Sequence, residues 1–138
     1  MKNQISNIEE SSNKKNWYIG YIFSREIKNN YIPQKVQNLV IRDYAKRLNF
    51  NLKLSATEYK MNKSFLVLKS LLKRNANYSG IIFYSVSMLW DCKEYKILLT
   101  KFLKNKIYLF FALEEFSVKN INDIIKLNQI FNISKNTI

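Results

Sequence analysis

The chain contains two kinds of hydrophobic pattern, which follow one another. One is a short continuous apolar run, and the other is a longer segment whose apolar residues recur at helical spacing. The first run, WYIGYIF (Trp17–Phe23), has the length and composition of a strand buried on both faces. A helical segment follows at residues 33–48. Pro33 suits its first turn, where a backbone N–H would have no partner within the helix. The same pair of signals then recurs along the chain.

Three further strands and three further helices are predicted by this alternation. Strands joined by helices of this length indicate βαβ crossovers and a parallel sheet. We therefore predict an α/β fold, a three-layer sandwich with a four-stranded, mainly parallel sheet and helices on both faces. The remaining strands are expected at residues 50–55, 80–85 and 106–113, and the remaining helices at 64–74, 91–105 and 118–131.

Length and composition indicate one domain with a substantial core. The chain has 138 residues, of which 47% are apolar, so residues 17–138 are expected to form a single α/β domain. Residues 1–16 are rich in Asn, Ser, Glu and Lys and are expected to form a disordered or loosely held tail. No apolar run is long enough to cross a bilayer, and the start lacks the apolar segment of a secretory signal. We expect a cytoplasmic protein.

The formal net charge of +13 has two interpretations. A basic surface can bind nucleic acid or a membrane. However, the basic residues are mostly Lys, scattered from Lys2 to Lys135 among abundant Asn and Ile, as an AT-rich genome would produce. We attribute the charge to this composition, do not expect nucleic acid as a partner, and retain a modest preference for anionic ligands.

Polar residues follow every predicted strand at its carboxyl end. Because parallel strands all end at the same edge of the sheet, these residues are expected to meet there, however far apart they lie in sequence. The sequence therefore predicts a ligand pocket at this edge, and the polar segment after Leu54 is expected to face it. In strand order, the residues are Ser24 and Arg25; Ser55, Thr57, Glu58 and Tyr59; Tyr84 and Ser85; and Glu114 and Glu115.

Carboxylates and a hydroxyl are the candidate catalytic groups. Glu58 and Glu114 could supply a general acid and base, because two carboxylates in unlike surroundings separate in pKa. Ser24 is expected to act either as a nucleophile, if a carboxylate or Lys activates it, or as a simple hydrogen-bonding group. Arg25 is expected to bind a carboxylate or phosphate of the substrate.

The other candidates are substrate-binding residues. Tyr59 and Tyr84 could stack on a substrate ring or lie at the rim of the core. Gln37 lies on the apolar stripe of its helix, where a buried amide needs partners, and it contacts either the ligand or the Ser24 loop. The remaining members of the predicted binding set are Ser55, Thr57, Ser85 and Glu115.

Several kinds of chemistry are excluded by composition. The chain has no His, so neither a Ser-His-Asp nor a Cys-His arrangement can form, and a His-based metal site is absent. Gly20 and Gly80 are the only glycines, and neither belongs to a phosphate-binding glycine motif. Cys92 is a lone cysteine that we interpret as structural. We expect no metal and no cofactor.

The segments GYIFSRE, PQKVQNLVIRDYA, LSATEYKM, GIIFYSVSML and FALEE resemble the sporadic carbohydrate cluster proteins, which are encoded among bacterial genes for surface polysaccharide synthesis. The match covers residues 18–115. The resemblance implies a role in surface carbohydrate biosynthesis (lipopolysaccharide or capsule), with an anionic sugar or nucleotide sugar bound and converted at the strand-end pocket. The family label describes gene neighbourhood, so it narrows the pathway more than the reaction.

The chain also resembles, more distantly, the catalytic domain of the serine recombinases, or resolvases. Ile19, Gly20 and Tyr21 fit the first strand of that family, and Gln37 fits its glutamine-bearing helix. The family's first arginine is replaced by Phe23, its nucleophilic serine would lie one residue later than Ser24, and residues 85–90 contain no Arg. The resemblance implies a shared fold without DNA cleavage, because recombination needs several arginines at the phosphoryl transition state.

Three functions remain open from the sequence. The leading hypothesis is the carbohydrate role just described. The alternative is a non-catalytic interaction or regulatory subunit for a glycan-biosynthesis enzyme, and the third is a nucleic-acid-binding protein with a recombinase-like fold that lacks recombinase activity. Aromatic residues on the predicted helix faces also favour a homodimer.

Overall fold

The computed structural model describes residues 16–72 and 77–136, which form an α/β fold. The predicted tail, apart from Asn16, lies outside the described residues. The elements in chain order are β1 (Trp17–Phe23), α2 (Gln34–Arg47), β2 (Asn51–Glu58), α3 (Leu66–Ser70), β3 (Gly80–Phe83), the 3-10 helix η1 (Val86–Leu89), α4 (Tyr95–Lys104), β4 (Tyr108–Phe111), β5 (Phe116–Val118) and α5 (Ile121–Asn136).

The described strands form one five-stranded mixed sheet in the order β2-β1-β3-β4-β5. The first four strands of this order are parallel to their neighbours, and β5 is antiparallel to β4. The prediction of four strands is therefore wrong by one. The missed strand has only three residues and follows β4 through a tight turn in which Glu115 adopts a positive φ of 52°. So short a strand leaves no detectable alternation in the sequence.

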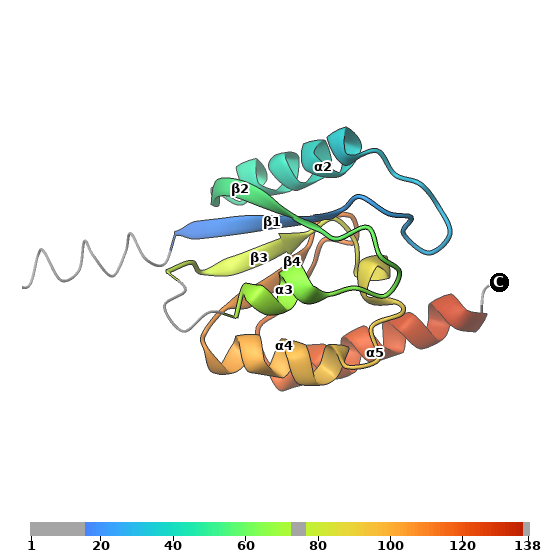
Figure 1. Cartoon of the computed structure of the whole chain (residues 1–138). Coiled ribbons are helices and arrows are strands. Elements are labelled where there is room, and N and C mark those ends of the chain that lie inside the picture. Colours follow the sequence, from blue (N-terminus) through green and yellow to red (C-terminus); the bar gives the residue numbers. More distant parts are fainter. Residues whose placement is uncertain (1–15, 73–76, 137–138) are drawn as a thin grey trace, which may run out of the picture.

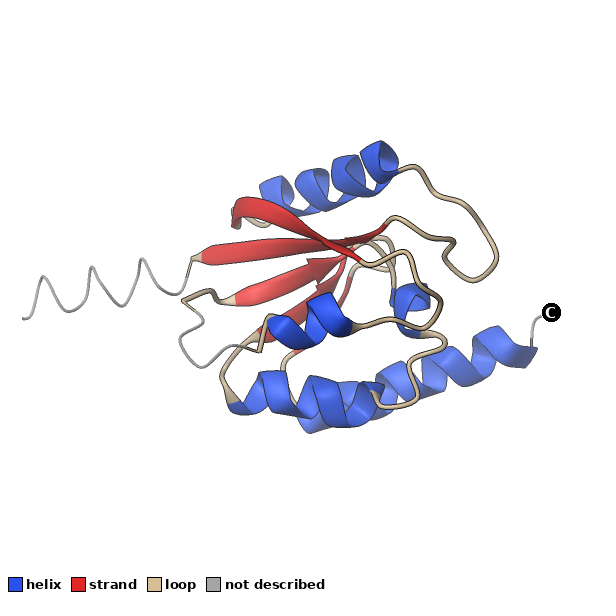
Figure 2. Cartoon of the chain, viewed as in Figure 1, coloured by secondary structure: helices blue, strands red, loops and turns tan. Residues whose placement is uncertain are grey.

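Helices cover both faces of this sheet. Among the described helices, α2 covers one face, and α3, α4 and α5 cover the other (Figure 1). The colouring by secondary structure shows the sheet between the two helical layers (Figure 2). The central strand β3 is buried at every position, which explains its continuous apolar sequence. None of the described helices is long and apolar enough to cross a membrane.

Aromatic rings fill much of the core on both sides of the sheet. On the α2 side, Tyr18 stacks on Phe50 with ring centroids 3.9 Å apart. On the opposite side, Phe83 stacks on Phe111 at 4.7 Å, and Tyr21 meets Phe83 edge to face. Such pairs add roughly 0.5–1.5 kcal/mol each beyond the area that they bury.

Strand β2 is longer than predicted. It was expected to end at residue 55, but Ala56, Thr57 and Glu58 continue the ladder with β1. Ser55 donates a hydrogen bond to Asn38 of α2 at 2.7 Å, and Thr57 is exposed. Most of the segment predicted to face a pocket is thus part of an edge strand, where partial exposure tolerates polar side chains.

Helix boundaries differ from the prediction in the second half of the chain. Of the helix expected at 64–74, the structure has α3 with only five residues, and 73–76 lie outside the described part. The helix expected from residue 91 begins at Tyr95, after the unpredicted η1. Helix α5 begins at Ile121 rather than at residue 118, because β5 occupies the preceding residues.

Candidate functional site

The sheet has a topological switch point between β1 and β3. From β1 the chain crosses to β2 on one side, and the later strands β3 and β4 lie on the other side. At the carboxyl edge of a parallel sheet, such a point opens a crevice where ligands commonly bind. The loop after β1, the loop after β2 and η1 all leave the sheet at this edge (Figure 1).

Arg25 is the main cationic side chain at this edge. It is 8% exposed, and its Nη1 donates a hydrogen bond to the Tyr59 carbonyl at 2.9 Å. Its guanidinium carbon lies 4.0 Å from the centroid of the Phe23 ring and 5.1 Å from that of Phe65. Cation–π contacts with these two rings therefore hold the charge in a fixed place.

The charge of Arg25 is incompletely compensated within the described part of the chain. Its Nη2 is buried without a hydrogen-bond partner, and no described carboxylate forms an ion pair with the guanidinium. Buried polar groups are nearly always hydrogen-bonded, and buried charges are usually paired. Arg25 is consequently the residue of this edge most suited to receive an anion.

Two hollows adjoin Arg25. The Trp90 hollow, of about 250 Å³, lies between the exits of β1 and β3 and is lined by Phe23, Arg25, Glu26, Lys28, Asn29, Asn62, Ser87, Trp90 and Asp91. The Ser24 hollow, of about 560 Å³, is lined by Ser24, Arg25, Glu26, Tyr31, Gln34, Lys60 and Asn62. Arg25, Glu26 and Asn62 border both hollows.

A third hollow adjoins the Trp90 hollow on its other side. This Cys92 hollow, of about 260 Å³, is lined by Lys63, Phe65, Lys69, Asp91, Cys92, Lys93 and Glu94 and shares Asp91 with the Trp90 hollow. Burial raises the pKa of the Cys92 thiol, which opposes formation of a reactive thiolate. We call the Ser24, Trp90 and Cys92 hollows the row of hollows, because each shares lining residues with the next in that order.

Glu58 is buried beside this row and fully engaged with the protein. The residue is only 1% exposed. Its carboxylate accepts hydrogen bonds from the Tyr21 hydroxyl at 2.7 Å and from the Tyr59 N–H at 2.9 Å. The N–H groups of Val67 and Leu68, both at 3.1 Å, also donate to it. The carboxylate thus satisfies the first turn of α3. A catalytic role for Glu58 stays a prediction.

Ser24 and Gln37 organise the loop that carries Arg25. The Ser24 hydroxyl donates to the Glu58 carbonyl at 3.2 Å. The Gln37 amide is fully buried; it accepts from the Phe23 N–H at 2.9 Å and donates to the carbonyls of Phe23 and Ile32. Gln37 was expected to contact either the ligand or the Ser24 loop. In the structure it bonds to the backbone at both ends of that loop, at Phe23 and Ile32.

A second group of predicted residues lies at the exits of β3 and β4. The Ser85 hydroxyl donates to Glu114 at 2.6 Å, and the same carboxylate accepts from the Val86 N–H at 2.9 Å, where η1 begins. Burial, followed by the nearby Glu114 charge, raises the pKa of Tyr84. Tyr84 and Ser85 line a fourth hollow of about 340 Å³, which shares Lys28 and Ser87 with the Trp90 hollow.

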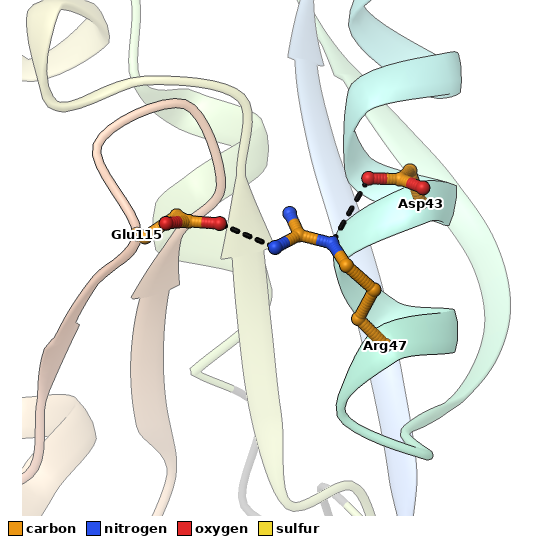
Figure 3. A network of polar contacts seen from close by, with 3 residues as sticks. All are labelled: Asp43, Arg47 and Glu115. Carbon is orange, nitrogen blue, oxygen red and sulfur yellow. Dashed lines mark hydrogen bonds and ion pairs between the residues drawn. The ribbon is translucent and has the colours of Figure 1, made fainter.

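Glu115 is engaged elsewhere. Its carboxylate pairs with Arg47 of α2, and Arg47 also contacts Asp43 at 3.0 Å (Figure 3). The hydrogen bond that Arg47 donates to Glu115 is the main cause that raises the pKa of Arg47. The carboxyl edge thus gathers Ser24, Arg25, Glu58 and Tyr59 in one group and Tyr84, Ser85 and Glu114 in another. Ser55 and Glu115 make contacts outside both groups, and Thr57 is exposed on β2.

No family model matches the chain, and no curated protein matches it. A solved structure that is similar is the N-terminal catalytic domain of TP901-1 integrase, with a TM-score of 0.60 and 16% sequence identity. The match covers 86% of this chain and 95% of that one. The chain has a resolvase-like fold. At this level of identity the likeness shows the fold alone, and it confirms that part of the sequence prediction.

This comparison overturns the leading functional prediction. A role in surface carbohydrate biosynthesis is wrong, because the similar structure is a recombinase catalytic domain and no comparison supports the sporadic carbohydrate cluster resemblance. The expected sugar partners lose their support for the same reason. The nucleic-acid alternative fits this neighbour better. It had been given less weight because the net charge was attributed to composition.

Several residues of the row of hollows were not predicted from the sequence. Lys28, Lys60 and Lys93 were grouped with a scattered basic surface, and Trp90 was not considered. Their position in the sequence could have identified these four residues. Each of them lies within a dozen residues after the end of a strand, in a loop or turn at the carboxyl edge of the sheet. Weighing Lys by position in the predicted topology, rather than by overall frequency, would have found them.

Proposed function

We propose that this protein is a nucleic-acid-binding domain with a recombinase-like fold that binds phosphate groups at the β1/β3 edge and does not cleave strands. The observation that carries the proposal is the buried, incompletely compensated guanidinium of Arg25 at the topological switch point. The neighbour is the catalytic domain of an integrase, and this fold likeness adds to the case.

Phosphate is the anion that suits this site best. A guanidinium offers a planar fork of donors that matches phosphate oxygens, and low local exposure strengthens the attraction. Lys28 and Lys60 line the hollows beside Arg25, and Ser24 lines one of them. The net charge of +13 would add a long-range attraction to a polyanion.

We infer that strands are not cleaved from the groups around Ser24 in the described part of the chain and from the sequence. Ser24 uses its hydroxyl proton in a hydrogen bond to the Glu58 carbonyl, and the chain has no His to act as a base. Transfer of a phosphoryl group requires several cations around the developing charge. Residues 85–90 contain no Arg, and Phe23 stands where the recombinase resemblance would place one.

Fluorescence anisotropy with labelled DNA and RNA tests this function. We expect binding whose affinity falls steeply between about 50 and about 200 mM salt, because condensed counterions are released. Arg25→Gln should weaken binding and reduce the dependence on salt by about one phosphate contact. Arg42→Gln, which removes the same charge from an exposed position of α2 that lines none of these hollows, is the matched control and should weaken binding much less.

Two results would contradict the proposal. Absence of binding to every nucleic acid at low salt would remove the function, provided that the protein is folded. Accumulation of nicked or covalently attached DNA would instead contradict the claim that strands are not cleaved. A denaturing gel of the same incubations detects both products.

A further inference from the structure

We infer that the row of three hollows is a single groove that takes a single strand of nucleic acid; this rests on the proposed function and specifies its ligand. We call the Ser24, Trp90 and Cys92 hollows together the strand-end groove. The three hollows adjoin one another, because Arg25, Glu26 and Asn62 border the first two and Asp91 borders the last two. The hollow at Tyr84 also adjoins the Trp90 hollow, but Lys28 is its only charged lining residue, so we leave it out of the groove.

Cations are spaced along the whole groove. Lys60 lines the Ser24 hollow at one end, Arg25 lines the middle, and Lys93 lines the Cys92 hollow at the other end. In the Cys92 hollow, Lys69 pairs with Glu94 at 3.4 Å, which offsets one of its acids. A row of separated cations is the arrangement that follows successive phosphates of a nucleic-acid backbone.

The other groups of the groove favour an unpaired strand over a duplex. Glu26 and Asp91 are exposed on its walls, and Asn29 and Asn62 present amides there. Carboxylates repel phosphates but accept hydrogen bonds from base amino groups, and unpaired bases expose those groups. A duplex uses its base-pairing edges internally and presents a regular double row of phosphates, which suits a uniformly basic surface better.

Trp90 supplies an aromatic side chain in the middle hollow. It is partly buried and lines the hollow together with Arg25, and the Lys28 ammonium lies 4.1 Å from its ring centroid. Bases of single strands stack on aromatic side chains with little dependence on sequence. Trp17, the other tryptophan of the chain, begins β1 at the opposite edge of the sheet.

The test compares charge removal at the two edges of the sheet. Lys60→Ala/Lys93→Ala removes both ends of the groove's row of cations. Lys46→Ala/Lys104→Ala removes the same charge near the ends of α2 and α4, at the amino edge. All four side chains are exposed, so both double variants should fold.

Anisotropy titrations with a strand of about ten nucleotides and with its duplex give the expected result. We expect the wild type to bind the single strand at least about tenfold more tightly than the duplex. The groove variant should lose about tenfold or more of the single-strand affinity, and the control variant less than about threefold. In Trp17→Phe protein, the remaining Trp90 fluorescence should change when the single strand is added.

Specific outcomes separate this inference from the proposed function. Equal or tighter binding of duplex, or equal losses for the two double variants, would overturn the groove while leaving nucleic-acid binding in place. Unchanged Trp90 fluorescence at saturation would also overturn it. Failure to bind either nucleic acid would instead remove the proposed function itself.

Discussion

Tyr21 donates its phenolic proton to the Glu58 carboxylate at 2.7 Å and so joins β1 to the end of β2 inside the protein. The same carboxylate holds the first N–H groups of α3. Burial, with the hydrogen bond to Glu58 as the next cause, raises the pKa of Tyr21 well above its ordinary value. This pair therefore fixes two of the chain segments that border the strand-end groove.

Loss of this hydrogen bond should destabilise the fold. We expect Tyr21→Phe to lower the free energy of unfolding by about 2 kcal/mol, because it removes a buried hydrogen bond to a carboxylate. Glu58→Gln should cost about 3 kcal/mol, because its amide group faces donors that need an acceptor. Urea denaturation followed by circular dichroism measures both values. Tyr31→Phe, at an exposed tyrosine, should change stability by less than about 0.5 kcal/mol.

The pH dependence of stability should also report Tyr21. In the unfolded chain a tyrosine loses its proton near pH 10, whereas folded Tyr21, with its raised pKa, keeps it. Its contribution to stability is therefore complete below about pH 10 and is lost as the pH rises toward the folded value. Between these limits, the free energy of unfolding of the wild type should fall more steeply with pH than that of Tyr21→Phe, by about 1.4 kcal/mol per pH unit. Equal alkaline slopes for the two proteins would show that Tyr21 does not keep its proton.

Replacement of Gln37 by an apolar residue of similar size should be costly. Gln37→Met leaves the Phe23 N–H and the carbonyls of Phe23 and Ile32 without their side-chain partner. We expect a loss of about 2–4 kcal/mol in the free energy of unfolding, from several unsatisfied buried groups. Gln34→Met, at an exposed position three residues earlier, is the matched control. If the two variants are equally stable, Gln37 does not hold the loop.

The two glycines should differ in their tolerance of a methyl group. At Gly80, an added Cβ would lie 2.7 Å from the Tyr108 carbonyl oxygen and 2.8 Å from the Phe110 ring, and this backbone cannot move aside. At Gly20, the closest atom would be the Ser55 hydroxyl at 2.5 Å, which can rotate away at the cost of its bond to Asn38. Gly80→Ala should therefore lower the melting temperature more than Gly20→Ala. Adding Ser55→Ala should restore part of the melting temperature lost in Gly20→Ala and none of that lost in Gly80→Ala.

Central, buried elements were predictable from the sequence for a physical reason. Strand β1 was predicted with its observed ends, because a strand covered on both faces must be apolar throughout. The meeting of strand ends at one edge followed from the parallel order. Edge elements were not predictable in this way, because β2 has a partly exposed face that accepts Ser55 and Thr57.

The candidate site was predictable only in part. Arg25 was found because it follows β1 directly, and the structure places it at the predicted edge. The engagement of Glu58 by Tyr21 and α3 could not be predicted, because it depends on the packing of segments remote in sequence. The lysines of the groove were hidden by a composition rich in Lys throughout.

Mapping of amide chemical shifts on isotope-labelled protein tests the central claim most directly. Titration with a single-stranded oligonucleotide should perturb residues 24–29, 60–63 and 87–93, which line the strand-end groove, and leave residues 46–51 and 104–107 at the amino edge unchanged. Perturbations spread evenly over the basic surface, or concentrated at the amino edge, would contradict binding at Arg25.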